Sequence, residues 1–456
     1  MQNPFIALKS RNFRIYWLGL GASQTGTWMQ NIAQPWLALK VTNDPVLVGI
    51  VSAMHFLPIM IFSLFSGVLI DRMDKKRILF FTQAGLCVVS FIFALSVFMD
   101  FASFGVILVL AFLTGLFNSL DSPTRHSFIY ELVENRALVP NAVALNSMSV
   151  SVSRILGPAL AGIIMASFGI GACFLFNTFS FVAIFASLFL VKPKRARTAR
   201  AHSSMLKSII KGFIYIKSHE HLLSPLIVLL IVATFVPNYS VLVSALVHFN
   251  LGGDDTSYGY LMAFLGVGAF FGAFFAASLG QNLAKTSKNS KEILNQNTNE
   301  LKKSSQILNQ NTNELKKPSQ ILNAPPLNHE KPALNTSQKI TLYLPFLSAL
   351  MLASVGIWDN FWLCGLSLIL TSFCLIITIS TINSLLQLGS DDKYRGRVMS
   401  VYSLFFLGST PIGASFAGFA VKHFGPDGAF FISAFVASFF LGLWHLFAKK
   451  ILISKR

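Results

Sequence analysis

The sequence predicts an all-α membrane protein built from two bundles of six helices. Of its 456 residues, 54% are hydrophobic and only 12% are charged, which is roughly half the charged fraction of an ordinary soluble domain. The apolar residues fall into uncharged blocks of about 20 residues, the length that a helix needs to cross the hydrocarbon of a bilayer. A third observation is that the basic residues collect in alternate loops.

Twelve membrane-crossing helices are expected from the apolar blocks. Their approximate ranges are 13–39, 46–70, 77–98, 103–122, 139–166, 170–191, 222–248, 257–280, 340–358, 361–388, 398–420 and 427–448. If the N-terminus is cytoplasmic, the termini and loops on that side hold all of the 36 Lys and Arg residues except Lys40, Arg154 and Lys422. This asymmetry follows the positive-inside rule, so both termini are predicted to be cytoplasmic.

The net charge of +18 follows from this arrangement of loops and therefore does not indicate binding to nucleic acid. The first apolar run is long and lacks a cleavage site of small residues, so it is expected to remain as a membrane anchor. The four cysteines lie in apolar spans without the spacing of a metal site. We expect neither a metal nor a cofactor.

The chain divides into two predicted bundles, residues 1–191 and 222–456, joined by a cytoplasmic linker at 192–221. In the linker, MLKSIIKGFIYIK has apolar residues at helical spacing with lysines between them, a pattern typical of a helix on a membrane surface. The second bundle contains a low-complexity cytoplasmic insertion at 281–338, in which ILNQNTNELKK occurs twice. Its composition favours a disordered segment, with a partner-binding helix as the alternative.

A tight cationic turn, GVLIDRMDKKR, joins the second and third spans. It resembles the loop signature of the major facilitator superfamily of transporters, and the resemblance covers nearly the whole chain. It implies that Gly67 lets two helices approach and that Asp71 is a latch, held against a helix terminus of the other half by about 0.3–1 kcal/mol. It assigns ion pairs to Arg72, Lys76 and Arg77. Asp74 stands where the signature has a second glycine, so the turn is expected to differ there.

Three further segments narrow the resemblance. They are similar to segments of the drug:proton antiporter branch, which includes macrolide efflux pumps and the enterobactin exporter. The three segments are DSPTRHSFIYELV, PNAVALNSMSVSVSRILGPALAG and DDKYRGRVMS. Pro158 removes one backbone N–H and Gly157 permits close helix contact, which suits a hinge or gate in the fifth span. Ordinary packing of small residues is the alternative.

Polar residues inside the predicted spans are candidates for substrate binding, because they are costly in lipid. Arg154 lies near the middle of the fifth span, where it either binds an anionic or carbonyl-bearing substrate or pairs structurally with helix dipoles. The first span is unusually polar, and a water-filled cavity is expected beside its residues Gln24, Thr27, Gln30, Asn31 and Gln34. The remaining candidates are Trp28, which flanks this stripe, and Asn238 and Tyr239 in the seventh span.

Two residues are candidates for proton coupling. His55, in the second span, is the mid-membrane group whose ordinary pKa lies near neutrality, and a hydrogen-bonded core histidine is the alternative. Asp121 is placed at the inner end of the fourth span, where an ion pair with the cluster from Arg72 to Arg77 is the favoured interpretation. No span has an acidic residue near its middle, unlike many proton-coupled drug pumps.

Together these features predict a secondary active transporter of the bacterial inner membrane and not an enzyme. It would export an amphipathic organic compound, either a drug or a siderophore-like molecule, in exchange for protons by alternating access. An importer or a lipid flippase on the same fold is the alternative, followed by a non-transporting scaffold. The expected partners are a small-molecule substrate, protons and the lipid bilayer, with the protein as a monomer.

Overall fold

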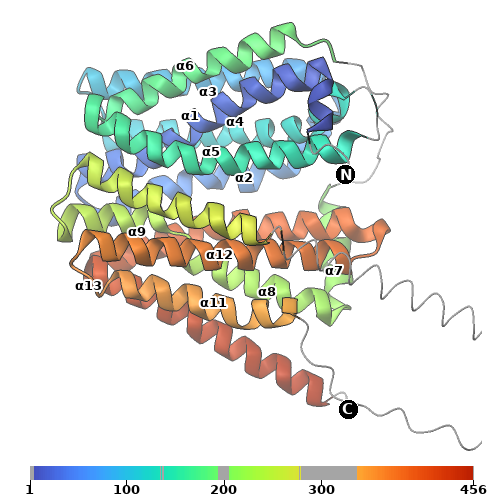
Figure 1. Ribbon diagram of the computed structural model, residues 1–456, viewed down its shortest axis with the longest axis vertical. Helices are drawn as coiled ribbons and strands as arrows, with labels where there is room; N and C mark the ends of the chain where they lie inside the picture. The colour runs from blue at the N-terminus through green and yellow to red at the C-terminus, as the bar shows by residue number, and fades with distance from the viewer. Residues whose placement is uncertain are drawn as a thin grey trace, which may run out of the picture.

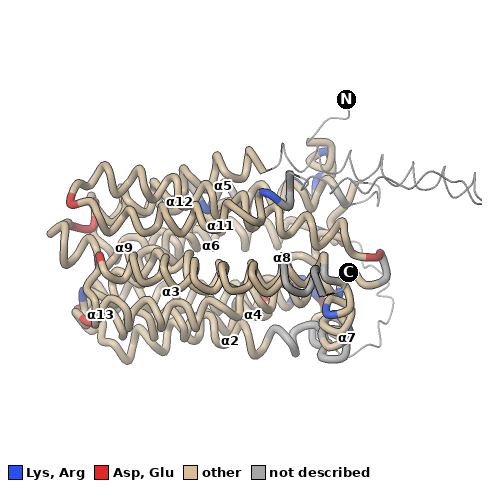
Figure 2. Tube along the Cα trace, turned by 90° about the horizontal axis from the view of Figure 1, so that it is seen from below, with Lys and Arg blue, Asp and Glu red and all other residues tan. Residues whose placement is uncertain are grey.

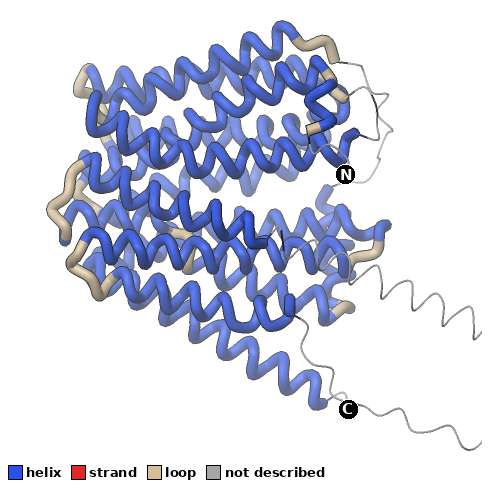
Figure 3. Tube along the Cα trace, in the orientation of Figure 1, coloured by secondary structure: helices blue, strands red, loops and turns tan. Residues whose placement is uncertain are grey.

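The computed structural model describes residues 5–133, 135, 138–193, 205–276, 278 and 336–454. Within these ranges the regular structure is helical and contains no strand (Figure 3). The predicted insertion at 281–338 lies outside the described residues except for its last three positions, which belong to a helix.

The first half of the chain forms a bundle of long helices (Figure 1). After a short 3₁₀ helix, η1 (Ile6–Lys9), come α1 (Arg11–Thr42), α2 (Pro45–Arg72), α3 (Lys75–Phe98), α4 (Phe104–Leu132), α5 (Val139–Phe168) and α6 (Ile170–Leu190). The ranges agree with the six predicted spans except in α4. This helix continues to Leu132, ten residues beyond the end predicted for the fourth span.

The second half forms the other bundle in Figure 1. Its helices are α7 (Met205–Lys217), α8 (Glu220–Phe235), α9 (Tyr239–Ala245), the π-helix η3 (Leu246–Asn250), a helix at Asp255–Ala276, α11 (Thr336–Val355), α12 (Phe361–Gly389) and α13 (Asp392–Ser454). The last of these merges two helices across Gly425, where φ is 71°. That left-handed conformation suits glycine, which lacks a Cβ.

The predicted seventh span is broken, contrary to the single helix expected over 222–248. Its first part ends at Phe235 and the second begins at Tyr239. Pro237 lies between them and has no backbone N–H to donate to the preceding turn. Interrupted helices of this kind are common near the substrate sites of transporters.

Nine helices of the described residues are long and apolar enough to cross a membrane. One of the nine is the merged segment Tyr394–Ala448, and Lys339–Val355 is a shorter apolar helix outside the set. The polar helix α1 is also outside it. The all-α membrane architecture is confirmed, and the count of twelve stays a prediction.

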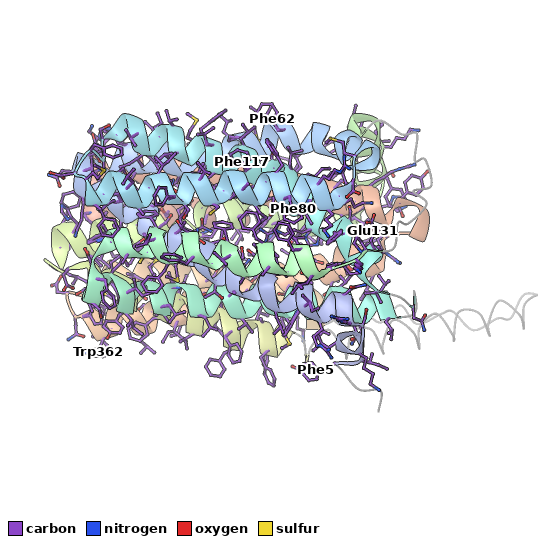
Figure 4. The ribbon with its side chains drawn as sticks, turned by 90° about the horizontal axis from the view of Figure 1, so that it is seen from above. Phe5, Phe62, Phe80, Phe117, Glu131 and Trp362 are labelled. Atoms are coloured by element: carbon purple, nitrogen blue, oxygen red, sulfur yellow. The ribbon has the colours of Figure 1, made fainter. Side chains whose placement is uncertain are left out.

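The surface of the bundles matches a lipid environment. Figure 2 shows the charged residues gathered mainly at the two ends of the helices. Many large apolar side chains between those ends are exposed, including Phe62 (Figure 4). We call the end that holds residue 5 and Ser454 the proximal end. The opposite end, with the turns at 43–44 and 251–254, is the distal end.

Candidate substrate site and its gates

Arg154 projects from α5 toward α1, where it meets an aromatic ring. Its guanidinium carbon is 5.0 Å from the centroid of the Trp28 ring, within the range of a cation–π interaction. The two helices approach closely beside this pair, because a Cβ added to Gly157 would lie 2.4 Å from the Trp28 Cβ. Pro158, the next residue, is buried. Gly157 therefore sets the position from which Arg154 reaches Trp28.

The second half contributes a tyrosine to the same place. The Tyr402 hydroxyl of α13 interacts electrostatically with Arg154. This hydroxyl is also hydrogen-bonded to the side chain of Asn383 on α12. The second half thus approaches Arg154 through Tyr402 of α13, and α12 is linked to it only indirectly, through Asn383. Tyr402 stands in no motif or polar run, whereas Asn383 lies in the polar run TISTINS at 378–384, a signal that the sequence-based candidates did not include.

Arg154 lacks a counter-ion in the part of the chain that the structure describes. No carboxylate there forms an ion pair with it, and its Nε is enclosed without a hydrogen-bond partner. Arg154 as a whole is partly exposed, so water or a ligand can reach the residue although Nε is enclosed. The part of this guanidinium that is not enclosed can therefore donate to an oxygen-bearing ligand.

The polar stripe of α1 is divided between two environments. Gln24, Thr27, Trp28 and Asn31 are partly exposed, and Thr27 donates from Oγ1 to the Ser23 carbonyl at 2.9 Å. Gln30 and Gln34 are buried instead, which contradicts the prediction that they face a water-filled cavity.

The reason for the burial of Gln30 is a polar cluster inside the first bundle. Its Oε1 accepts hydrogen bonds from Ser90 Oγ and Asn177 Nδ2, each at 2.7 Å. Partners on α3 and α6 thus satisfy the buried amide, as a polar group in an apolar interior requires.

Asn238 and Tyr239 lie at the break between α8 and α9. Asn238 is only 3% exposed, and its Nδ2 donates to the Thr234 carbonyl at 2.8 Å. It packs against Gly413 of α13, where a Cβ would lie 2.8 Å from the Asn238 Oδ1. The Tyr239 hydroxyl is buried without a hydrogen-bond partner among the described residues. No described contact joins either side chain to Arg154, and Asn238 instead stabilises the break.

His55 is buried at a tight contact between α2 and α4. A Cβ on Gly115 would lie 2.0 Å from the His55 carbonyl oxygen. The imidazole contacts the Phe56 ring edge-on, with centroids 5.0 Å apart. The structure therefore places it inside the first bundle, in an apolar setting.

Asp121 is 1% exposed and held by several partners. It accepts hydrogen bonds from Thr82 Oγ1 at 2.8 Å and Gln83 Nε2 at 2.6 Å, and it pairs with Arg125 one turn further along α4. The described basic residues of the cluster, Lys75, Lys76 and Arg77, form no ion pair with Asp121, and the side chain of Arg72 lies outside the described residues, so a pair with Arg72 stays a prediction. The α4 helix buries its own opposite charge four residues away, so it need not end at Asp121.

The turn between α2 and α3 shows what Asp74 does in place of a glycine. Its carboxylate accepts hydrogen bonds from the backbone N–H groups of Lys76 at 2.9 Å and Arg77 at 3.3 Å. It therefore caps the N-terminus of α3. The side chains of Gly67, Asp71 and Arg72 lie outside the described residues, so the latch stays a prediction.

Two lysines beside this turn bind within the first bundle. Lys76 donates to the Val191 carbonyl at 2.8 Å, so it contacts a backbone oxygen where an ion pair was predicted. Its neighbour Lys75 pairs with Glu131 near the end of α4, at the proximal end in Figure 4. The charged end of α4 is thereby joined to the start of α3.

The two halves are joined at the distal end by a set of contacts that we call the distal seal. Trp36 Nε1 donates to Asp255 Oδ1 at 2.7 Å, and Lys40 pairs with the same carboxylate. Two more polar contacts are His248 with Asn43 at 2.8 Å and Lys422 with Asp44 at 2.9 Å. These pairs cross between the halves and hold the distal end closed.

Small residues bring the helix backbones together behind the distal seal. A Cβ on Gly259 would lie 2.0 Å from the Gly162 Cα, so α5 touches the helix at Asp255–Ala276. A Cβ on Gly49 of α2 would lie 2.6 Å from the Ala414 carbonyl oxygen of α13. Close contact through small residues is the usual way in which helices associate in membranes.

Comparison with known proteins identifies the family. Residues 2–290 and 330–451 match the transmembrane secretion effector family of the major facilitator superfamily. The chain belongs to this family. The family and the matched relatives are transporters and not enzymes, in agreement with the prediction, whereas assignment to the drug:proton antiporter branch stays a prediction.

Two curated relatives align with part of the chain. The staphyloferrin A transporter of Staphylococcus aureus is 26% identical over 255 residues, covering 53% of this chain and 61% of the relative. The uncharacterized MFS-type transporter YfiS of Bacillus subtilis is 29% identical over 217 residues, covering 45% and 50%. The chain thus spans between half and about three-fifths of the length of these relatives.

Solved structures support the fold over nearly the full length. A bacterial homologue of the human lysosomal transporter Spinster, in an inward-facing unoccupied conformation, superposes with a TM-score of 0.68 at 11% identity, covering 97% of this chain and 98% of that one. The nucleoside transporter NupG gives a TM-score of 0.69 at 8% identity, covering 95% and 98%. At such identities the likeness shows the fold alone.

Proposed function

We propose that this protein is a secondary transporter of the bacterial inner membrane that exports an amphipathic organic compound carrying a carboxylate or carbonyl group. The observation that carries the proposal is the Arg154 guanidinium, which is partly exposed and forms no ion pair with a carboxylate among the described residues. Planar guanidinium groups bind carboxylate and carbonyl oxygens in two places at once. The substrate oxygen would supply the partner that the chain does not.

The groups around Arg154 suit an amphipathic ligand. Trp28 offers an apolar ring face at the guanidinium, and Tyr402 with Asn383 offers a hydroxyl and an amide from the opposite half. A ligand that contacts both halves can shift the balance between access states, because its affinity differs between them. Gln24, Thr27 and Asn31 would line the path along α1, and Asn238 and Tyr239 would shape the helix break opposite.

A siderophore is the first substrate class to test. The support comes from the relative named as a staphyloferrin A transporter, together with the unpaired cation of the site. Drugs with an acidic or carbonyl group satisfy the same chemistry and form the second class.

Protons are the proposed driving ion, and His55 and Asp121 are the two candidate carriers. Both are buried within the first bundle, where a change of protonation state would alter helix packing. The halves would rock about the site, with the distal seal closing one side and the predicted Asp71 latch acting on the other. Both termini would be cytoplasmic and the working unit a monomer.

Transport into proteoliposomes tests the proposal. The purified protein is reconstituted, a pH gradient is imposed, and accumulation of siderophores, macrolides and cationic dyes is measured with and without a protonophore. We expect gradient-driven accumulation of a compound with a carboxylate or carbonyl group, and its loss with the protonophore. Accumulation of cationic dyes alone would contradict the role given to Arg154, and transport that ignores the gradient would contradict proton coupling.

A further inference from the structure

The helix α7 has one face packed against the protein. Gly212 lies so close to α13 that a Cβ would be 2.6 Å from the Arg397 carbonyl oxygen. Ile216 on the same face is buried. Next to them, the Tyr215 ring stacks on that of Tyr394 with centroids 4.4 Å apart and planes 5° apart. This face is therefore fixed to the start of α13.

The other face of α7 is apolar and uncovered. Ile210 is 56% exposed and Ile214 is 62% exposed, and Phe213 beside them is 46% exposed. Residues three and four apart share one side of a helix, so these three form one continuous patch. Lys211 and Lys217 are exposed as well, and α7 contains no acidic residue.

The position of α7 brings this patch to the edge of the membrane-crossing bundle. It lies at the proximal end in Figure 1, where it contacts α13 of one half and α2 of the other. The sequence from Lys192 to Lys217 carries 8 Lys and Arg residues and no Asp or Glu. A helix with an apolar face and flanking lysines at this depth fits the boundary between lipid headgroups and acyl chains.

We propose that α7 is a docking helix for anionic phospholipid. Ile210, Phe213 and Ile214 would enter the headgroup boundary, while Lys211 and Lys217 would bind lipid phosphates. Electrostatic attraction to an anionic leaflet strengthens the binding with each basic residue near the surface. Because α7 bridges α2 and α13, the bound lipid would contact the seam between the two halves.

Depth measurements by spin labelling test this inference on the full chain. Ile214→Cys, in a Cys87→Ser background, is labelled with a nitroxide after reconstitution into vesicles of phosphatidylglycerol or of phosphatidylcholine. Accessibility of the label to oxygen, which partitions into lipid, is compared with accessibility to a water-soluble nickel chelate. The readout does not depend on transport, so it remains interpretable if the proposed substrate class is wrong.

In phosphatidylglycerol the label should be oxygen-accessible and shielded from the nickel chelate. The double variant Lys211→Gln/Lys217→Gln should remove about half or more of the difference in label accessibility between phosphatidylglycerol and phosphatidylcholine vesicles, because each basic residue contributes to the attraction. The matched control is Lys339→Gln, which removes one exposed lysine near the start of α11, also at the proximal end, and should change nothing. Equal depth in both lipids, or free access of the nickel chelate in phosphatidylglycerol, would overturn the inference.

Discussion

Trp36 of α1 lies flat against Tyr258 of the opposite half, with ring centroids 4.8 Å apart and ring planes 11° apart. The same indole donates its N–H to Asp255. Stacking and hydrogen bonding therefore act together at the centre of the distal seal. Both rings are almost fully buried. Water can therefore reach the indole N–H and the Asp255 carboxylate between them only when the two halves separate.

Trp36→Phe should weaken the distal seal while keeping an aromatic ring at the site. The hydrogen bond to the Asp255 carboxylate is lost, and a hydrogen bond to a charged group contributes about 1.5–3 kcal/mol, which corresponds to a shift of about tenfold or more in an equilibrium. The measurement is the distance distribution between spin labels at Val41 and Phe249, both of which are exposed at the distal end. The population with separated labels should grow.

The matched control for the seal is Trp362→Phe. Trp362 lies at the distal end, and its side chain is 70% exposed (Figure 4). This variant should leave the distances unchanged. Equal effects of the two substitutions would show that Trp36 does not hold the seal.

The contact between Asp44 and Lys422 should depend on pH only in acid. The hydrogen bond from Lys422 lowers the pKa of the Asp44 carboxyl below its ordinary value, and the backbone N–H of Val46 acts in the same direction. A lowered pKa means that this contribution to closure is present above the ordinary value and is lost as the pH falls through the lowered one. The same spin-label pair should therefore show no Asp44-dependent change from pH 8 to 5.

Asp44→Asn provides the control for the acid transition. It should reproduce the acid state at neutral pH, with a small effect, because Lys422 is half exposed and such pairs are screened by solvent and salt. A transition between pH 5 and 7 that disappears in Asp44→Asn would contradict this account.

Most of the helices and their order could be predicted from the sequence. Apolar length and the position of charged turns are local properties, so the ranges of α2, α3 and α6 agree with expectation within a few residues. The fourth span was misjudged for a physical reason. Charges usually mark the end of a span, but Asp121 and Arg125 neutralise each other inside the bundle, and Glu131 finds Lys75 on α3.

The candidate site was predicted less completely, because its partners are distant in sequence. Arg154 stood out as a charge within a span, and Trp28 as part of a polar run. Tyr402 reaches Arg154 only through the packing of the two halves, and no local pattern announces it. Gln30 shows the converse error, since a polar residue can be satisfied by buried neighbours as well as by water.

Gly157→Ala should destabilise the protein despite the better helix propensity of alanine. The added Cβ would lie 2.4 Å from the Trp28 Cβ, and overpacking of this kind costs about 1–3 kcal/mol. Gly442→Ala is the control, since a Cβ there meets nothing within 4 Å. The melting temperature in detergent should fall for the first variant and not for the second. If Gly157→Ala lowers the melting temperature no more than Gly442→Ala does, α1 and α5 can move apart enough to accept the added Cβ.

Asp121→Asn should destabilise the first bundle by leaving Arg125 as an unpaired buried charge. Removing one partner of such a pair costs about 3–5 kcal/mol. Adding Arg125→Gln should restore part of the loss, because the double variant buries no charge. Melting temperatures of the two single variants and the double variant give the coupling directly. Strict additivity would show that the two charges do not stabilise each other.

If Asp121 is also a proton carrier, the double variant should separate that role from stability. It should be folded and should bind substrate, but a pH gradient should no longer drive accumulation in proteoliposomes. The corresponding test for His55 is His55→Gln, which keeps a polar side chain of similar size. Normal gradient-driven transport by either folded variant would remove that residue from the coupling path.

The Arg154 variants decide whether this guanidinium binds substrate. Lys keeps the charge but loses the planar fork that grips an oxygen pair, and Ala removes both the charge and the contact with Trp28. If Arg154 binds the substrate, Arg154→Lys should fold and reach the membrane but transport poorly, and Arg154→Ala should lose binding. If its role is structural, both variants should lower the melting temperature, and the folded fraction should bind with unchanged affinity. Tyr402→Phe refines the result, because it removes the hydroxyl facing Arg154 from the other half: a binding role predicts weaker affinity at an unchanged melting temperature, whereas a purely structural role predicts the reverse. Unchanged affinity in all three variants would exclude Arg154 from the substrate site.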